Sequence, residues 1–150
     1  MLCKKRIPSI IDNAERILRL LFHPKYVTKD EKIRPNAFRP SAKDEVSVNR
    51  LDYSSPFKCK AQGLYMQRKK YVFFGFGVLK ASEIRNVNAD VIYHPTENKA
   101  HANIKVGYIP EKGQEFPAEF QYKYKQLSKI ARLYKDPHPD KKTWDGDELT

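Results

Sequence analysis

The chain has 150 residues, of which 40% are hydrophobic and 31% are charged, and its formal net charge is +11. This composition is typical of a globular domain, because a disordered chain lacks the apolar side chains that offset conformational entropy. No apolar run reaches the length of a transmembrane helix, and the basic start lacks the uninterrupted apolar segment of a signal peptide, so we expect a cytoplasmic protein.

The charge is distributed unevenly along the chain. Residues 136–150 hold five acidic side chains and two lysines, a net of −3, so the first 135 residues carry +14. We therefore expect one basic domain over residues 1–135 and a polar, acidic tail over 136–150. Two cysteines, at positions 3 and 59, predict thiols rather than a disulfide framework, and neither a metal nor a cofactor is expected.

The first predicted element is a helix over residues 9–22. Its apolar residues recur at helical spacing, at Ile10, Ala14, Ile17 and Leu21. His23-Pro24 ends it, because proline disfavours helical geometry in the residue before it. Residues 24–44 contain three prolines and predict an ordered loop, which Phe38 attaches to the core.

Strands and short helices follow. Alternation predicts a strand over 45–51, with Val46 and Val48 on its apolar face and Ser47 and Asn49 on its polar face. The apolar run at 71–79 predicts a central strand in which Gly75 and Gly77 indicate a bulge or a close backbone approach. Two further strands are expected at 89–93 and 102–108, with short helices at 54–60 and 80–85. The predicted fold class is therefore α+β, a single domain with a mostly antiparallel sheet of about four strands.

A last helix is predicted to begin at Pro117 and to extend to Tyr134, with one apolar face. The N- and C-terminal helices are expected to pack on the sheet. In the tail that follows, Trp144 is the only tryptophan, and we expect it to anchor the tail on the domain or on a protein partner.

The polar face of this last helix is the clearest binding feature in the sequence. Its cations would track a phosphate backbone, each neutralised phosphate releasing counterions. The predicted nucleic-acid-binding residues are Lys123, Lys125, Lys129, Arg132 and Lys135, extended by the cluster Arg68, Lys69 and Lys70. An ordinary solvated helix face would show the same pattern.

The segment His94–His101 is the best catalytic candidate, because it joins two predicted strands and carries two histidines. Arg50 ends the first predicted strand and would reach the same edge of the sheet. Together His94, His101 and Arg50 would supply a base, an acid and a fixed charge for metal-independent phosphodiester cleavage or group transfer.

Three segments carry a resemblance: Arg34-Pro35-Asn36-Ala37-Phe38, Val46–Arg50, and His94-Pro95 with Asn98-Lys99-Ala100-His101-Ala102. They resemble a group of small uncharacterised prokaryotic proteins with an Ala-Phe loop, a Ser-Val-x-x-Arg-like strand and an Asn-x-Ala-His-Ala segment. The resemblance covers roughly residues 20–107, implies a prokaryotic or phage origin, and directs attention to Arg50, Asn98 and His101.

The sequence therefore predicts a small basic accessory subunit that binds nucleic acid, or another polyanion, without sequence preference, within a larger prokaryotic assembly. One alternative is the metal-independent nuclease or transferase that uses His94, His101 and Arg50. The other is a protein-interaction module whose basic face binds an acidic partner. No membrane partner is expected.

Overall fold

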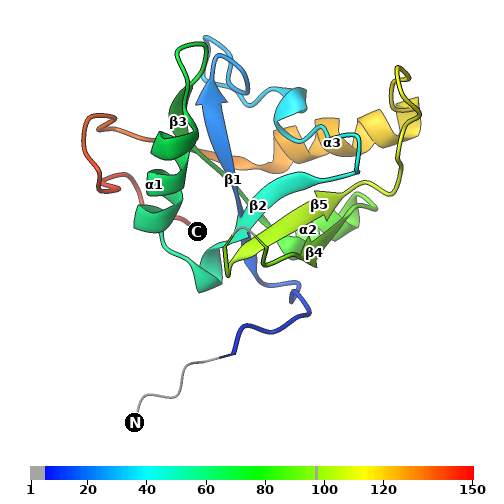
Figure 1. The fold of residues 1–150 in the computed structure, drawn as a ribbon, viewed down its shortest axis with the longest axis horizontal. Coiled ribbons are helices and arrows are strands. Elements are labelled where there is room, and N and C mark those ends of the chain that lie inside the picture. The colour runs from blue at the N-terminus through cyan, green and yellow to red at the C-terminus, as the bar shows by residue number, and fades with distance from the viewer. Residues whose placement is uncertain (1–5, 97) are drawn as a thin grey trace.

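The structure is a computed structural model that describes residues 6–96 and 98–150. Within these residues one six-stranded sheet forms the centre of the fold, in the spatial order β4-β5-β2-β1-β3-β6 (Figure 1). All neighbouring strands are antiparallel. The strands are β1 (Arg16–His23), β2 (Val46–Arg50), β3 (Val72–Lys80), β4 (Asp90–Tyr93), β5 (His101–Lys105) and β6 (Arg132–Lys135). The fold is α+β, with six strands where the sequence predicts about four.

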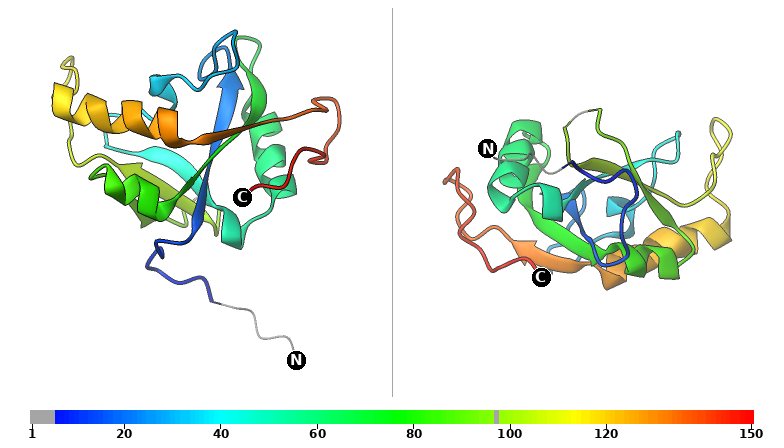
Figure 2. Two further views of the ribbon diagram at one scale, coloured as in Figure 1. Left: turned by 180° about the vertical axis from the view of Figure 1, so that it is seen from behind. Right: turned by 90° about the horizontal axis from the view of Figure 1, so that it is seen from below.

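Helices cover the two faces of the sheet unequally. They are α1 (Pro56–Met66), α2 (Ala81–Asn86) and α3 (Ala118–Ile130), with 3-10 turns η1 (Pro35–Ala37) and η2 (Leu51–Tyr53). Helix α1 lies on one face, whereas α2 and α3 lie on the other, as the view from behind shows (Figure 2). Ser55 caps α1 by accepting the Lys58 backbone N–H at 3.1 Å, and Pro56 occupies its first turn.

Each face carries its own apolar core. Beneath α1 lie Leu18, Leu20, Phe22, Leu51, Cys59, Phe73, Phe76, Val78 and Leu149. The larger core lies on the side of α2 and α3 and includes the fully buried Phe38, so the predicted attachment of the 24–44 loop is confirmed. Helix α1 packs over β1 and β3, whereas the side chains of β2 and β5 on the same side of the sheet are polar: Ser47, Asn49, His101 and Asn103.

The prediction of a first helix over 9–22 is wrong, because residues 16–23 form β1 between β2 and β3. Both faces of this strand are buried: Ile17 and Leu21 join the larger core, while Leu18 and Phe22 lie beneath α1. A strand that is buried on both faces has a nearly continuous apolar run, and in so short a segment such a run also satisfies helical spacing.

The last helix also differs from its prediction. Helix α3 begins after Pro117, as expected, but it ends at Ile130, and the chain continues as the edge strand β6. Strand β6 pairs with β3 so closely that a Cβ on Gly75 would lie 2.0 Å from the Tyr134 carbonyl oxygen. The close backbone approach predicted at Gly75 is therefore confirmed, and glycine is required there by its neighbour.

The C-terminal residues 136–150 pack against the body of the domain, on the side of α1 away from β2 (Figure 1). The Lys60 ammonium is fully buried, lies 2.9 Å from Asp136 Oδ2, and donates to the carbonyls of His138 and Thr143 at 2.9 and 2.8 Å. The Trp144 ring packs on Phe76, with ring centroids 4.5 Å apart. Among the described helices, none has the length and apolarity to cross a membrane.

Candidate functional site: a polar groove beside helix α1

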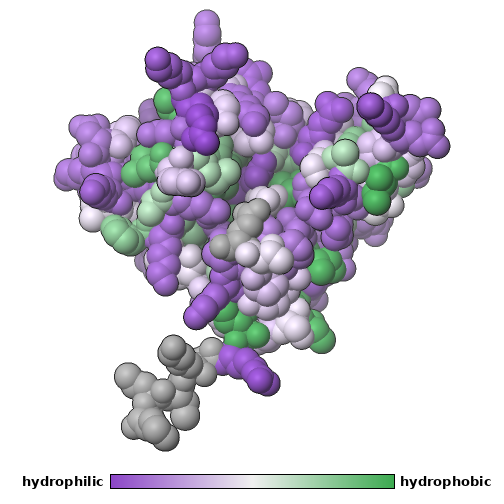
Figure 3. All heavy atoms as spheres, in the orientation of Figure 1, coloured by the Kyte–Doolittle hydropathy of each residue, from purple (hydrophilic) through white to green (hydrophobic). Residues whose placement is uncertain are grey.

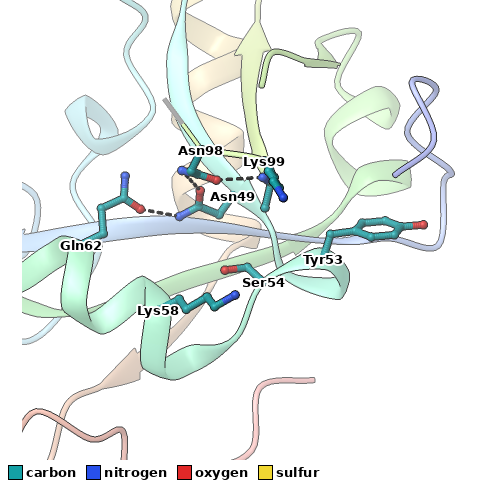
Figure 4. Close-up of a pocket in the computed structure, with 8 residues that line it drawn as sticks. Asn49, Tyr53, Ser54, Lys58, Gln62, Asn98 and Lys99 are labelled. Carbon is teal, nitrogen blue, oxygen red and sulfur yellow. Dashed lines mark hydrogen bonds between the residues drawn. The ribbon is translucent and has the colours of Figure 1, made fainter. Parts of the chain in front are cut away.

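A cavity of about 320 Å³ opens where the end of β2, helix α1 and the β4–β5 loop meet. Its described lining consists of Asn49, Tyr53, Ser54, Lys58, Gln62, Asn98, Lys99 and Ala100 (Figure 4). Lys58 and Gln62 are four residues apart on α1, so they lie on one side of the helix. The strand supplies Asn49 and the loop supplies Asn98 and Lys99. We call this cavity the amide–lysine pocket.

Three side-chain amides form a hydrogen-bonded chain across the floor of this pocket (Figure 4). The backbone N–H of Ala100 donates to Asn98 Oδ1 at 2.8 Å. Asn98 Nδ2 then donates to Asn49 Oδ1 at 3.2 Å, and Asn49 Nδ2 donates to Gln62 Oε1 at 2.8 Å. Because a backbone N–H only donates, Ala100 fixes Asn98 Oδ1 as an acceptor, and this choice fixes the orientation of the other two amides in turn.

Two lysines give the pocket a surplus of donors, because an ammonium group donates hydrogen bonds and accepts none. Each amide oxygen already accepts one hydrogen bond, while the Gln62 amide nitrogen, at the end of the chain, remains a donor beside α1. Lys58 and Lys99 are exposed at the rim. No carboxylate is among the described residues that line the pocket (Glu97 lies outside them). A donor-lined pocket with two ammonium groups suits an anion of phosphate size.

A second cavity, of about 110 Å³, adjoins the first and shares Asn49 and Gln62 with it. Its floor is apolar, formed by Leu18, Leu20 and Phe22 of β1, and Met66 lies at its edge. Its remaining lining is Arg19, Ser47, Val48 and His101. We call this second cavity the apolar slot, and the two cavities together the α1 groove.

The thiol of Cys59 lies directly behind the amide chain. Its Sγ is 3.7 Å from Asn49 Nδ2 and 3.6 Å from Ser54 Oγ. Burial raises the pKa of the Cys59 thiol, an effect only partly offset by hydrogen bonds from Ser54 and Asn49. The thiol is therefore neutral near pH 7 and supports the pocket wall rather than acting as a nucleophile.

The three residues of the catalytic hypothesis are neighbours along the backbone. His94 N–H donates to the His101 carbonyl at 3.0 Å, and the Arg50 N–H donates to the Ala100 carbonyl at 2.8 Å. The rings of His94 and His101 lie 5.6 Å apart, and His101 Nδ1 donates to the His94 carbonyl oxygen at 2.7 Å. His101 is opposite Asn49 in the register, so its ring faces the α1 groove.

Arg50 leaves the sheet through the opposite face, because side chains alternate along a strand and Asn49 faces the groove. Its guanidinium is fully buried, pairs with both oxygens of Glu15 at 2.7 and 2.8 Å, and donates to the Pro8 carbonyl at 2.5 Å. The rings of Tyr53 and Tyr93 lie on it at 4.7 and 4.6 Å. This environment gives Arg50 a structural role, and catalysis by the trio stays a prediction.

The predicted cationic face of the last helix is divided in the structure. Lys125 and Lys129 are exposed on α3, whereas Arg132 and Lys135 belong to β6. Lys123 donates to the carbonyls of Asn88 and Val106, both at 2.8 Å. Lys135 pairs with Glu31 at 2.5 Å, and Arg132 donates to the Thr150 carbonyl at 3.2 Å.

The cluster Arg68, Lys69 and Lys70 lies in the turn between α1 and β3, near the Met66 end of the groove. All three side chains are exposed, and Arg68 donates to the carbonyls that end α1. Figure 3, which faces α1, shows hydrophilic side chains over much of this side of the molecule. The predicted cluster therefore extends the cationic character of the α1 groove.

Sequence reasoning missed Lys58 and Gln62. The predicted helix over 54–60 includes Lys58 but ends before Gln62, whereas α1 extends to Met66. The spacing of Lys58, Gln62 and Met66, four residues apart, was the signal that would have placed them on one helix side. Asn49 was predicted on the polar face of its strand, and that placement is correct.

Comparisons with family models, with curated proteins and with solved structures find no match to this chain. Within the described residues, no group of three or more His, Cys, Asp or Glu side chains is placed to hold a metal ion. Function is therefore inferred from the geometry of the α1 groove and from the charge of the molecule.

Proposed function

We propose that this protein binds nucleic acid through the phosphate backbone, without sequence preference, and that the α1 groove is the binding site. The observation that carries the proposal is the amide–lysine pocket, where Lys58 and Lys99 flank a chain of amides whose oxygens already accept hydrogen bonds. Phosphate oxygens accept hydrogen bonds and carry charge, so they match both features of the pocket.

The charge of the whole molecule supports the same ligand. The net charge is +11, and the acidic segment 136–150 runs on the side of α1 away from β2 (Figure 1). A field of this sign attracts polyanions and accelerates their encounter with the protein. Contacts to phosphate carry no sequence information, so binding is expected to be largely independent of base sequence.

In this proposal the protein acts as a small accessory subunit within a larger prokaryotic assembly, and other subunits of that assembly supply any chemistry. An acidic protein partner would be attracted by the same charge. A competition experiment distinguishes a nucleic-acid ligand from an acidic protein partner. Because the amide–lysine pocket suits tetrahedral phosphate, inorganic phosphate or polyphosphate should displace the nucleic acid more effectively than an acidic peptide of equal charge does.

The test compares two double variants that remove the same charge at different places. The pocket variant, Lys58→Gln with Lys99→Gln, removes the two positive charges at the rim of the amide–lysine pocket. The α3 variant, Lys125→Gln with Lys129→Gln, removes two positive charges from the exposed face of α3. Binding of a fluorescent oligonucleotide is measured over a range of salt. For a single strand the slope of log affinity against log salt falls by about 0.7 for each lost phosphate contact, so the pocket variant should lose about 1.4.

The α3 variant is expected to retain the wild-type slope, with only a small loss of affinity from the lower net charge. An unchanged slope in a folded pocket variant, together with a reduced slope in the α3 variant, would move the site to α3. Absence of binding by the wild-type protein at low salt would refute the function itself.

A further inference from the structure

The two cavities of the α1 groove differ in chemistry and share a wall. The amide–lysine pocket presents donors and ammonium groups, whereas the adjoining apolar slot has a floor of Leu18, Leu20 and Phe22. Asn49 and Gln62 line both. A nucleotide has the same division, because its charged phosphate and its flat, largely apolar base are joined through one sugar.

We propose that the α1 groove takes single-stranded nucleic acid, with one base seated in the apolar slot and its phosphate between Lys58 and Lys99. This inference rests on the proposed function and names the form of nucleic acid that it selects. Bases in a duplex are paired and stacked, so a base enters a side cavity only from a single strand or after leaving the stack.

The lining of the slot suits a base. Three apolar side chains from one strand line the slot, and Met66, which is 41% exposed, adds an adaptable thioether. Asn49 of the adjacent strand β2 and Gln62 of helix α1 add side-chain amides to the lining. An amide group both donates and accepts, so it pairs with different bases, which agrees with binding that tolerates any sequence.

A neighbouring aromatic side chain extends the site. Tyr65 is 83% exposed on α1 and follows Gln62 by three residues, so the two occupy neighbouring positions on the helix surface. An exposed tyrosine next to a cationic groove is a stacking platform that accepts every base. Arg68, Lys69 and Lys70 continue the cationic path past the end of α1 and would contact the next phosphates.

The first part of the test compares three ligands of equal length for the wild-type protein: a single strand, the same strand with abasic sites throughout, and a duplex. The abasic strand keeps every phosphate and lacks only the bases. Removal of the bases is expected to weaken binding by roughly 5- to 150-fold, the range of one stacked base. The single strand should also bind at least tenfold more tightly than the duplex.

The second part uses two variants at one position. Ser47 is exposed and lies on the slot wall, so Ser47→Leu fills the slot while leaving the phosphate contacts intact, and Ser47→Ala keeps it open. Ser47→Leu should bind the normal and the abasic strands equally, with an unchanged salt slope. Ser47→Ala should retain the preference for bases.

Each outcome separates this inference from the function on which it rests. Equal binding of the normal and the abasic strands by the wild-type protein refutes the seated base but leaves phosphate binding in place. The seated base is also refuted if folded Ser47→Leu prefers the normal strand as strongly as the wild type does. Failure to bind any of the three ligands refutes the proposed function as well.

Discussion

Removing the charge of Glu15 tests whether Arg50 is a structural residue. In the Glu15→Gln variant one carboxylate oxygen becomes an NH₂ group, which then faces an N–H of the Arg50 guanidinium. That guanidinium has no exposed surface, and its contacts with Glu15 are 2.7 and 2.8 Å long. Loss of one partner from a buried ion pair costs about 3–5 kcal/mol, whereas loss from an exposed pair costs below about 1 kcal/mol.

The remaining contacts of Arg50 place the expected loss of unfolding free energy at the lower end of the range for a buried ion pair. The Pro8 carbonyl and the rings of Tyr53 and Tyr93 still hold the guanidinium, so we expect about 3 kcal/mol. In a chain of this length each kcal/mol lowers Tm by about 2–4 °C, which gives a decrease of roughly 6–12 °C. Circular dichroism during thermal and urea unfolding measures both quantities.

A double variant provides the control. Glu15→Leu with Arg50→Met replaces the pair by apolar side chains and should recover much of the stability that the single variant loses. Oligonucleotide binding by Glu15→Gln, measured well below its Tm, should equal that of the wild type, because Arg50 lies on the face away from the groove. A loss below about 1 kcal/mol, or loss of binding in a fully folded variant, would refute this description of Arg50.

Three further predictions concern the packing around α1 and β3. Gly75→Ala should destabilise the fold by more than about 2 kcal/mol, because the added methyl group meets the backbone of β6. Gly77→Ala should destabilise it much less, because the nearest atoms to the added methyl group would lie at 3.5 Å. Urea unfolding of the two variants measures the difference. Lys60→Met should release the C-terminal residues, since the buried Asp136 carboxylate loses its counter-charge and keeps, among the described residues, only the His138 N–H. A red-shifted, readily quenched Trp144 emission would report the release, whereas an unchanged spectrum would contradict the role given to Lys60. In a variant whose other cysteine is replaced by serine, the Cys59 thiol of the folded protein should react slowly with a disulfide reagent at pH 8. In urea it should react at the rate of a free thiol. Fast reaction in the folded protein would contradict the burial and the raised pKa of this thiol.

Much of the sheet was predictable because local patterns decide it. The strands at 46–50, 72–80 and 90–93 and the start of α3 all follow their sequence signals. The strand β1 did not, because Ile17 and Leu21 satisfy helical spacing as well as the needs of a strand buried on both faces. Whether this segment forms a helix or a strand depends on its pairing with β2 and β3, which are distant in sequence and leave no local signal.

The candidate site was predictable only in part. The pattern placed Asn98 in the β4–β5 loop and Asn49 on the correct face of its strand, whereas His101, predicted at the end of that loop, is the first residue of β5. The same alternation puts Arg50 on the opposite face, but it does not indicate the partner Glu15, whose position depends on the path of the preceding segment. Lys58 became part of the site only because α1 docks beside β2.

The central claim is that the α1 groove, rather than the exposed face of α3, holds the nucleic acid. Side-chain amide signals test it most directly, since Asn49, Asn98 and Gln62 each carry an NH₂ group that nuclear magnetic resonance detects. On titration with a single-stranded oligonucleotide, we expect these three signals to shift together with one dissociation constant, while the backbone amides of Lys125 and Lys129 stay in place. Shifts confined to α3, with the three side-chain amides unchanged at saturation, would contradict the account.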